Sequence, residues 1–136
     1  MNIIYHLALQ ADWDEVVDNA TIYYPPTYGQ DGYTHGTGNL ERLLEVANHF
    51  YQASQGDWVC LVMTVESLAE TDVLVKFEPA ANVGNQDGDF DGNQDTTNPE
   101  LFPHIYGGIA PSAVHAIYSV VRNSQGGFIR ITLPSD

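Results

Sequence analysis

The chain has 136 residues, a length typical of one domain, and 43% of them are hydrophobic, so it can bury a core. We expect a single domain over residues 1–136. Four Lys and Arg residues stand against 18 Asp and Glu residues, giving a formal net charge of −14. Binding to phosphate backbones relies on clustered Lys and Arg, so this balance excludes a general nucleic-acid binder and disfavours an anionic membrane surface.

Targeting and redox signals are sparse. No apolar run approaches the roughly 18 residues that a membrane-spanning helix needs, and the first residues lack the basic start of a signal peptide. The single cysteine, Cys60, lies in an apolar run and is interpreted as a buried thiol. We expect a cytoplasmic protein.

The first third of the chain alternates short elements with loops. Residues 2–9 predict a strand, and residues 12–19 predict a short helix capped by Asp12. The two prolines within residues 23–28 predict an extended aromatic loop, which is also a candidate surface for a protein partner. Residues 33–35 then predict a short strand between glycines.

Residues 39–53 carry the strongest helix signal. Apolar residues recur with the helical period, and Thr37 or Asn39 is the expected cap. The apolar stripe comprises Leu40, Leu43, Leu44, Ala47, Phe50 and Tyr51. We expect it to pack on Val59, Leu61, Met63, Val75 and Ile117, so that Leu44→Ala costs roughly 2–5 kcal/mol of stability.

The rest of the chain reads mostly as strands. Residues 57–66 predict a buried strand, residues 66–71 a turn, and residues 73–77 a strand that ends before Pro79. An acidic loop insert follows at about residues 82–100, and two strands at 113–122 and 127–133 close the chain as a hairpin. This order predicts an α+β fold with a mostly antiparallel sheet and one principal helix.

Three histidines are candidates for chemistry, and for each a structural role fits as well. His6 follows apolar residues of the first strand, His35 lies between glycines, and His104 lies in a rigid aromatic segment. Their spacing matches no short zinc motif, and the sequence holds no nucleophile elbow and no phosphate loop. His49 and His115 are interpreted as solvated or structural residues.

Four segments together resemble a known family. They are residues 4–7, 32–35, 47–51 and 101–107, which read Ile-Tyr-His-Leu, Gly-Tyr-Thr-His, Ala-Asn-His-Phe-Tyr and Leu-Phe-Pro-His-Ile-Tyr-Gly. They resemble the domain-of-unknown-function 952 family, in which similar motifs recur in this order. That family is similar to the ADP-ribosyltransferase fold, so the resemblance implies a split antiparallel sheet around a cleft that binds NAD in the enzymes.

The resemblance also implies roles for single residues. Tyr5 and His6 resemble the first-strand motif that contacts the NAD ribose, and Tyr33 to His35 resemble the second-strand motif near the nicotinamide. The catalytic candidates are therefore His6, His35 and His104, and the ligand-binding candidates are Tyr5, Tyr33, Thr37 and Tyr106. Departures from the family pattern are His49 in place of arginine, Gly36-Thr37 in place of Cys-Ser, and no confident match for a catalytic glutamate, with Glu100 the nearest.

Two classes of function remain open. One is a binding module that holds a small ligand, such as a nucleotide, in a cleft that His6 and His35 share between aromatic walls of Tyr5, Tyr33 and Tyr106. The alternative is an NAD-dependent ADP-ribosyl transferase or a related hydrolase, with NAD as its cofactor.

The acidic insert suggests a metal. Residues 87–98 align with a calcium loop of the EF-hand type, with glycine at its sixth position. Its expected ligands are Asp87, Asp89, Asp91, Asn93 through its backbone carbonyl, and Asp95. Position 12 is Asn98 rather than a bidentate glutamate, and a solvated acidic insert without calcium is the alternative.

Overall fold

The structure is a computed structural model, and it describes residues 2–52, 56–79 and 101–132. In chain order its elements are β1 (Ile3–Leu9), α1 (Gln10–Asn19), α2 (Tyr28–Asp31), β2 (Thr34–His35), α3 (Leu40–Phe50), β3 (Trp58–Thr64), α4 (Val65–Ala69), β4 (Leu74–Pro79), β5 (Leu101–Tyr106), the 3-10 turn η1 (Pro111–Ala113), β6 (Ala116–Arg122) and β7 (Phe128–Thr132).

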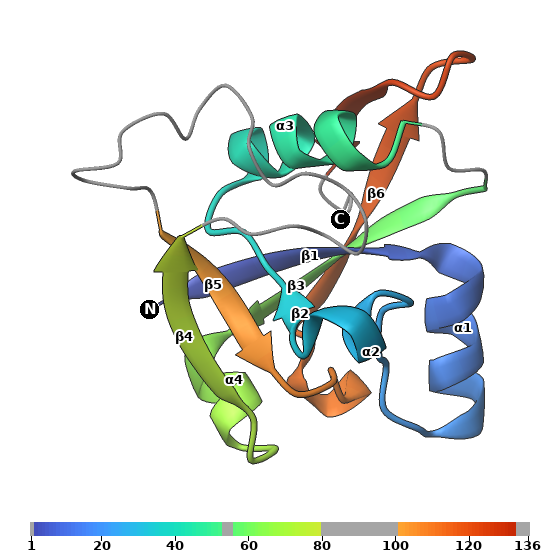
Figure 1. Cartoon of the computed structure of the whole chain (residues 1–136). Helices are drawn as coiled ribbons and strands as arrows, with labels where there is room; N and C mark the ends of the chain where they lie inside the picture. Colours follow the sequence, from blue (N-terminus) through green and yellow to red (C-terminus); the bar gives the residue numbers. More distant parts are fainter. Residues whose placement is uncertain (1, 53–55, 80–100, 133–136) are drawn as a thin grey trace.

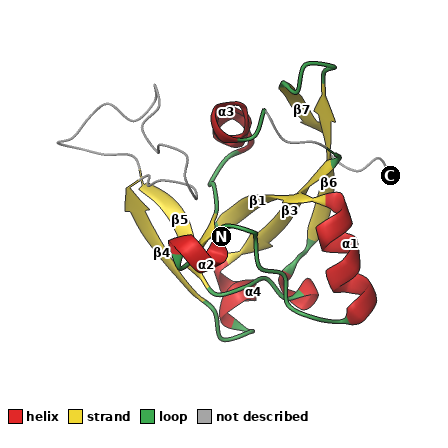
Figure 2. Ribbon diagram, turned by 45° about the vertical axis from the view of Figure 1, so that its right-hand side comes forward, coloured by secondary structure: helices red, strands yellow, loops and turns green. Residues whose placement is uncertain are grey.

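The described strands form two antiparallel sheets. The larger sheet has the order β1-β3-β6-β7, and the smaller has the order β2-β5-β4. Figure 1 shows α3 lying above β1 and α1 lying beside it, and Figure 2 shows β4 and β5 set apart from the larger sheet. The prediction of an α+β fold with antiparallel pairing is confirmed.

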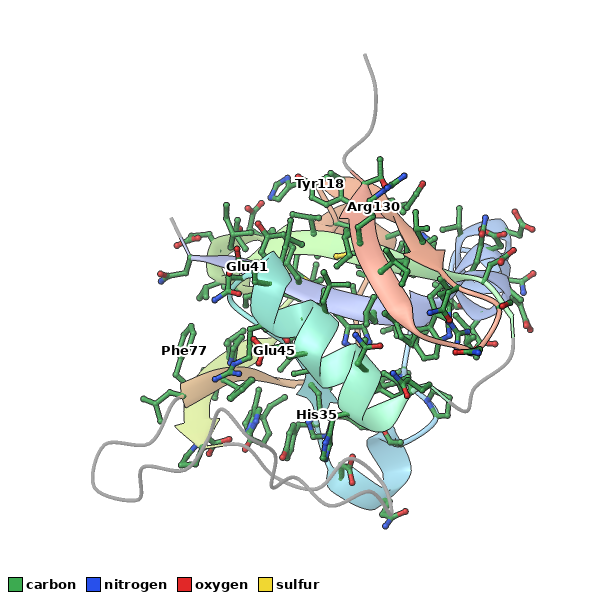
Figure 3. The ribbon with its side chains drawn as sticks, turned by 90° about the horizontal axis from the view of Figure 1, so that it is seen from above. His35, Glu41, Glu45, Phe77, Tyr118 and Arg130 are labelled. Carbon is green, nitrogen blue, oxygen red and sulfur yellow. The ribbon has the colours of Figure 1, made fainter. Side chains whose placement is uncertain are left out.

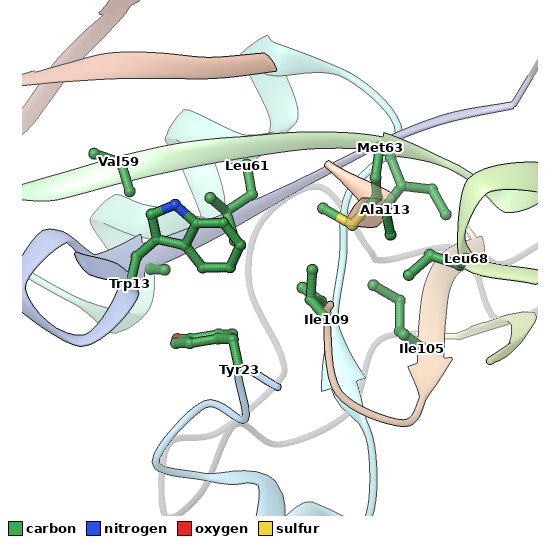
Figure 4. Close-up of a cluster of buried hydrophobic side chains, with 11 residues drawn as sticks. Trp13, Tyr23, Val59, Leu61, Met63, Leu68, Ile105, Ile109 and Ala113 are labelled. Atoms are coloured by element: carbon green, nitrogen blue, oxygen red, sulfur yellow. The ribbon is translucent and has the colours of Figure 1, made fainter. Parts of the chain in front are cut away.

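Strand β3 lies at the centre because all of its seven residues are buried. Its side chains alternate between two clusters, as strand geometry requires. Cys60 and Val62 join Leu43 and Ala47 of α3 on one face of the sheet. On the other face a separate cluster fills the space toward the smaller sheet (Figure 4); from β3 it receives Val59, Leu61 and Met63.

This alternation corrects the predicted partners of α3. Leu61 and Met63 belong to the cluster on the far face of the sheet, and so does Val59. Val75 packs against that same far cluster, while Ile117 is 43% exposed. The pattern of residues 59–63 cannot indicate which side chains face the helix, because every position in this run is hydrophobic.

The predicted helix exists but is shorter than expected. It spans Leu40–Phe50, and the side chain of Asn39 caps it by accepting a 2.7 Å hydrogen bond from the Arg42 backbone N–H. Leu43 is only 3% exposed, whereas Leu44 is half-buried at the edge of the same cluster. Truncation to alanine should therefore lower the stability of the fold more at Leu43 than at Leu44.

Several predicted boundaries are wrong. Helix α1 begins at Gln10, directly after β1, so Asp12 lies within its first turn and does not cap it. The predicted turn at 66–71 is largely the helix α4, which Thr64 and Ser67 start with reciprocal side-chain hydrogen bonds. Two elements were missed: the short helix α2 and strand β5. Pro103 of β5 has no N–H to donate, but its carbonyl still accepts from the Gly36 N–H.

The predicted acidic insert lies outside the described residues, and with it the calcium ligands Asp87, Asp89, Asp91, Asn93 and Asp95. Among the residues that the structure does describe, no group of three or more His, Cys, Asp or Glu side chains could hold a metal ion. No helix in those same ranges is long and apolar enough to cross a membrane.

Candidate functional site

The site arises where the two sheets separate. Tyr5 of β1 exchanges two backbone hydrogen bonds with Thr37, of 2.8 and 2.9 Å. A straight ladder would next place residue 35 opposite Leu7. Instead His35 pairs with His104 of β5, so the chain leaves β1 after one bridge.

Gly36 makes this departure possible. Its N–H donates to the Pro103 carbonyl at 3.0 Å. A Cβ at this position would lie 2.8 Å from the Ile4 Cγ2 and 3.0 Å from the same carbonyl oxygen. Only glycine lets β1 and β5 approach the backbone this closely.

The separation exposes backbone groups on the edge of β1. The Val65 N–H donates to the Asn2 carbonyl, and the Gln10 N–H donates to the Asp57 carbonyl. The backbone N–H and C=O groups of the even-numbered residues of β1 therefore point toward β3. The backbone groups of odd-numbered residues therefore point to the opposite edge, where Tyr5 meets Thr37. Leu7 is next along this edge, and its N–H and C=O have no partner within the described part of the chain.

A cavity of about 210 Å³ adjoins this edge. Both His6 and His35 line it, and Figure 3 shows His35 near α2 and the carboxyl end of α3. The remaining lining residues are aromatic, aliphatic or proline with one threonine, namely Leu7, Leu9, Tyr23, Pro25, Pro26, Thr27, Tyr51 and Trp58. None of the described lining residues carries a carboxylate, an ammonium or a guanidinium group.

His6 is the polar centre of this cavity. Its side chain is 5% exposed, and its Nδ1–H donates to the backbone carbonyl of His35 at 2.5 Å. Burial lowers the pKa of His6 from 6.5 to about 4, against the weaker opposing effect of that hydrogen bond. The ring is therefore neutral near pH 7, and its buried Nε2 is an acceptor with no hydrogen-bond partner in the described residues.

His35 is held by the helix that precedes it. Its Nε2–H donates to Asp31 Oδ2 of α2 at 2.8 Å. The ring lies between the cavity and a second group of side chains, with its centroid 4.8 Å from that of Tyr33 and 5.8 Å from that of His104.

That second group, the Glu78 cluster, consists of Tyr33, Glu78, His104 and Tyr106. Tyr33 stacks on His104 with ring centroids 4.2 Å apart and an interplanar angle of 21°. The Tyr106 hydroxyl and the His104 Nδ1–H both donate to Glu78 Oε1, at 2.5 and 2.9 Å. These contacts cross from β5 to the neighbouring strand β4.

The pKa shifts in this cluster follow from the shared carboxylate. The hydrogen bonds from Tyr106 and His104 lower the pKa of Glu78, and the same carboxylate raises the pKa of Tyr106 to about 12. Burial lowers the pKa of His104, although Glu78 opposes this. Glu78 thus accepts hydrogen bonds from two of its neighbours, and side chains linked in this way are typical of a structural network.

The structure thus divides the predicted site residues. His6 and His35 share the cavity, while His104, Tyr33 and Tyr106 form the adjoining cluster. The expected aromatic walls were wrong for this cavity, because Tyr23, Tyr51 and Trp58 supply them.

Tyr5 lies elsewhere because side chains alternate along β1, which turns it toward α3, where it packs near Tyr118 with ring centroids 6.4 Å apart. Thr37 is buried, and its backbone bridge to Tyr5 marks one end of the open edge.

Neither Glu78 nor the backbone of Leu7 is among the site residues predicted from the sequence. Glu78 stands in an ordinary strand pattern and is found only through pairing with β5. The edge position of Leu7 depends on which strand lies next to β1, and its side chain gives no sign of it. Tyr51 lines the cavity but was predicted only as part of the apolar stripe of the helix. Its place in one of the four segments that resemble the family was the signal that could have pointed to it.

Comparison with known proteins confirms the resemblance to the domain-of-unknown-function 952 family. Residues 7–117 match the family described as "Protein of unknown function (DUF952)". No curated protein matches the sequence. The crystal structure of protein CC0527 from Caulobacter crescentus has a TM-score of 0.64 at 20% identity, covering 93% of each chain. Its solution NMR structure has a TM-score of 0.58 at 19% identity, covering 94% of this chain and 91% of that chain. At this identity the likeness shows the fold alone.

Proposed function

The chain belongs to the DUF952 family, and we propose that its cavity binds a small, uncharged, planar molecule with an amide edge. The observation that carries the proposal is a concentration of unpartnered polar groups at an otherwise apolar cavity. Leu7 contributes a backbone donor and acceptor on the open edge of β1, and His6 contributes the acceptor Nε2.

The size and walls of the cavity support this ligand class. Its 210 Å³ is smaller than the roughly 300–1,000 Å³ of sites for drug-sized molecules, so it suits a single ring. Tyr23, Tyr51 and Trp58 provide aromatic surface for a flat group. The neutral His6 and the absence of charged groups among the described lining residues favour an uncharged ligand.

The polar groups favour an amide. The N–H and C=O of one strand residue point the same way and pair with an acceptor and a donor in one plane. An amide offers both, and a primary or cyclic amide offers them on the same side. A buried polar group without a partner costs about 1–3 kcal/mol, so a ligand that satisfies Leu7 and His6 gains affinity from both.

Nicotinamide and benzamide are the probes that test this proposal by NMR titration. N,N-Dimethylbenzamide is the matched control, because it keeps the ring and the carbonyl but has no N–H. We expect the two donor-bearing amides to bind at least about ten-fold more tightly. Equal binding of benzamide and its dimethyl derivative, or no binding of any of the three, contradicts the proposal.

A pair of variants locates the binding. His6→Asn keeps a side-chain N–H near the position of Nδ1 but removes Nε2, and it should weaken benzamide binding about ten-fold. His104→Asn makes the same exchange in the Glu78 cluster and should leave the affinity unchanged. An equal effect of the two variants argues against the cavity as the site.

The alternative function is an NAD-dependent transferase or hydrolase of the ADP-ribosyltransferase-like type. It is favoured by one observation: the nicotinamide ring of NAD is a planar carboxamide of the size that the cavity accepts. The described lining lacks the carboxylate that would stabilise a ribosyl cation, and Glu78 is engaged with Tyr106 and His104. Release of free nicotinamide from NAD supports the enzyme, and binding without release supports the binding module.

Calcium binding by Asp87, Asp89, Asp91, Asn93 and Asp95 stays a prediction. Calorimetry with millimolar calcium tests it, and the heat should disappear in the Asp87→Ala, Asp91→Ala double variant.

A further inference from the structure

A second hollow lies along helix α1. Five residues of α1 line it with the spacing of one helix face, and β3 and β6 close it from the sheet side. The lining consists of Gln10, Trp13, Asp14, Val17 and Asp18 of α1 with Val59 and Ile117. This α1 groove has a volume of about 440 Å³ and shares none of these residues with the His6 cavity.

The α1 groove combines exposed aliphatic walls with carboxylates. Val17 is 48% exposed and Ile117 is 43% exposed. Helix α1 packs chiefly on β1, and this leaves Ile117 of β6 open. Asp14 and Asp18 stand one turn apart on its helical wall. Asp14 also borders an adjoining hollow that reaches Asp57. None of these three carboxylates forms an ion pair within the described residues.

Trp13 provides an independent sign of a ligand. Its side chain is 3% exposed, yet the indole Nε1–H has no hydrogen-bond partner among the described residues. Figure 4 shows the nitrogen on the edge of the ring that faces β3 near Val59, which lines the same groove. A buried N–H without an acceptor costs stability, and a bound carbonyl oxygen would remove that cost.

We propose that the α1 groove binds a short peptide segment of a partner protein that carries aliphatic and lysine or arginine side chains. The aliphatic side chains pack on Val17 and Ile117, and the cations pair with Asp14 and Asp18. A main-chain carbonyl of the segment accepts from Trp13 Nε1. An open groove along a helix face suits a peptide, whereas small molecules prefer enclosed cavities.

Charge disfavours a second copy of this chain as the occupant. The chain carries a formal net charge of −14, and its copy would bring the same carboxylates to the same groove. Like charges across an interface disfavour association, whereas a basic segment is attracted over a distance set by the ionic strength.

The test uses the full chain with ¹⁵N-labelled tryptophan side chains. The chain has two tryptophans, so a Trp58→Phe sample assigns the indole resonance of Trp13. The probe is an acetylated, amidated peptide of alternating leucine and lysine, and the control probe replaces each lysine with glutamate. We expect the lysine peptide to shift the Trp13 Nε1–H resonance downfield in a saturable way, and the glutamate peptide to leave it unmoved.

Charge-matched variants separate the groove from general attraction to an acidic protein. Asp14→Asn with Asp18→Asn should weaken the lysine peptide roughly ten-fold. Glu66→Gln with Glu70→Gln removes the same charge from exposed positions in α4 and at its C-cap, and should leave the affinity within about two-fold. An unmoved Trp13 resonance at a saturating concentration of the lysine peptide overturns the proposal, and so does an equal effect of the two variant pairs.

Discussion

His6 and His104 occupy two regions that meet at His35, and the two residues differ in the group that accepts their Nδ1–H. Both are buried, and both donate through Nδ1. His104 donates to a carboxylate, under a stacked Tyr33, inside a network on the smaller sheet. His6 donates to a backbone carbonyl, and its Nε2 stays without a partner beside an apolar cavity.

The difference shows how a fold separates structural from ligand-binding polar groups. In the Glu78 cluster, hydrogen bonds between side chains join two strands and leave little for a ligand to gain. At the cavity, the polar groups of His6 and Leu7 have lost hydration without gaining a hydrogen bond, and a ligand that pairs with them offsets this loss of free energy. Residue type alone does not distinguish these cases, because histidine serves in both.

The largest expected effect concerns the pH dependence of stability at His6. Its pKa is about 4 in the folded chain and near 6.5 when unfolded. Between these values the unfolded chain binds a proton that the folded chain does not bind, so stability falls as the pH falls from 6.5 to 4. At about 1.4 kcal/mol for each pH unit, the total loss is about 3 kcal/mol.

Urea unfolding at a series of pH values measures this effect as the difference between the wild type and His6→Asn. The variant has no titrating group at this position, so the difference isolates His6 from the many carboxylates of the chain. Parallel curves for the two proteins between pH 6.5 and pH 4 would show that His6 is not held neutral by burial.

The next effect concerns Gly36, where the two regions divide. Gly36→Ala brings a Cβ against Ile4 and the Pro103 carbonyl, and such overpacking costs about 1–3 kcal/mol. Gly38→Ala is the matched control, because nothing lies within 4 Å of its added Cβ. Thermal unfolding compares the two. Equal stability of both variants would mean that β1 and β5 are not held together as closely as the structure has them.

The smallest effect concerns Tyr106 in the Glu78 cluster. Tyr106→Phe removes the largest cause of the lowered pKa of Glu78, so the pKa of this carboxyl should rise toward 4.5. NMR titration of the Glu78 side chain measures the change. The affinity of the cavity for benzamide should not change, since Tyr106 does not line it. A weaker affinity of the variant for benzamide would show that the cavity and the Glu78 cluster act as one binding site.

Local patterns predicted much of this molecule. The helical period at 40–51 and the Asn39 cap predicted α3, because an amphipathic stripe and a polar cap act within a few residues of each other. Alternation and turn residues predicted β1, β3, β4, β6 and β7 to within a few residues. The motifs around His6 and His35 directed attention to two side chains that line one cavity.

The sequence by itself determined the principal helix, five of the described strands, the acidic character and the candidate histidines. Only the tertiary structure decided that His6 donates to a backbone carbonyl and buries an unpartnered Nε2 while His104 donates to the carboxylate of Glu78, that Tyr5 turns toward α3, and that Leu7 lies on an open edge. These outcomes depend on which strands pair and where the chain leaves β1 after Gly36. The hydrogen-bond partners of these buried groups come from residues far away in the sequence, so the local sequence pattern cannot predict them.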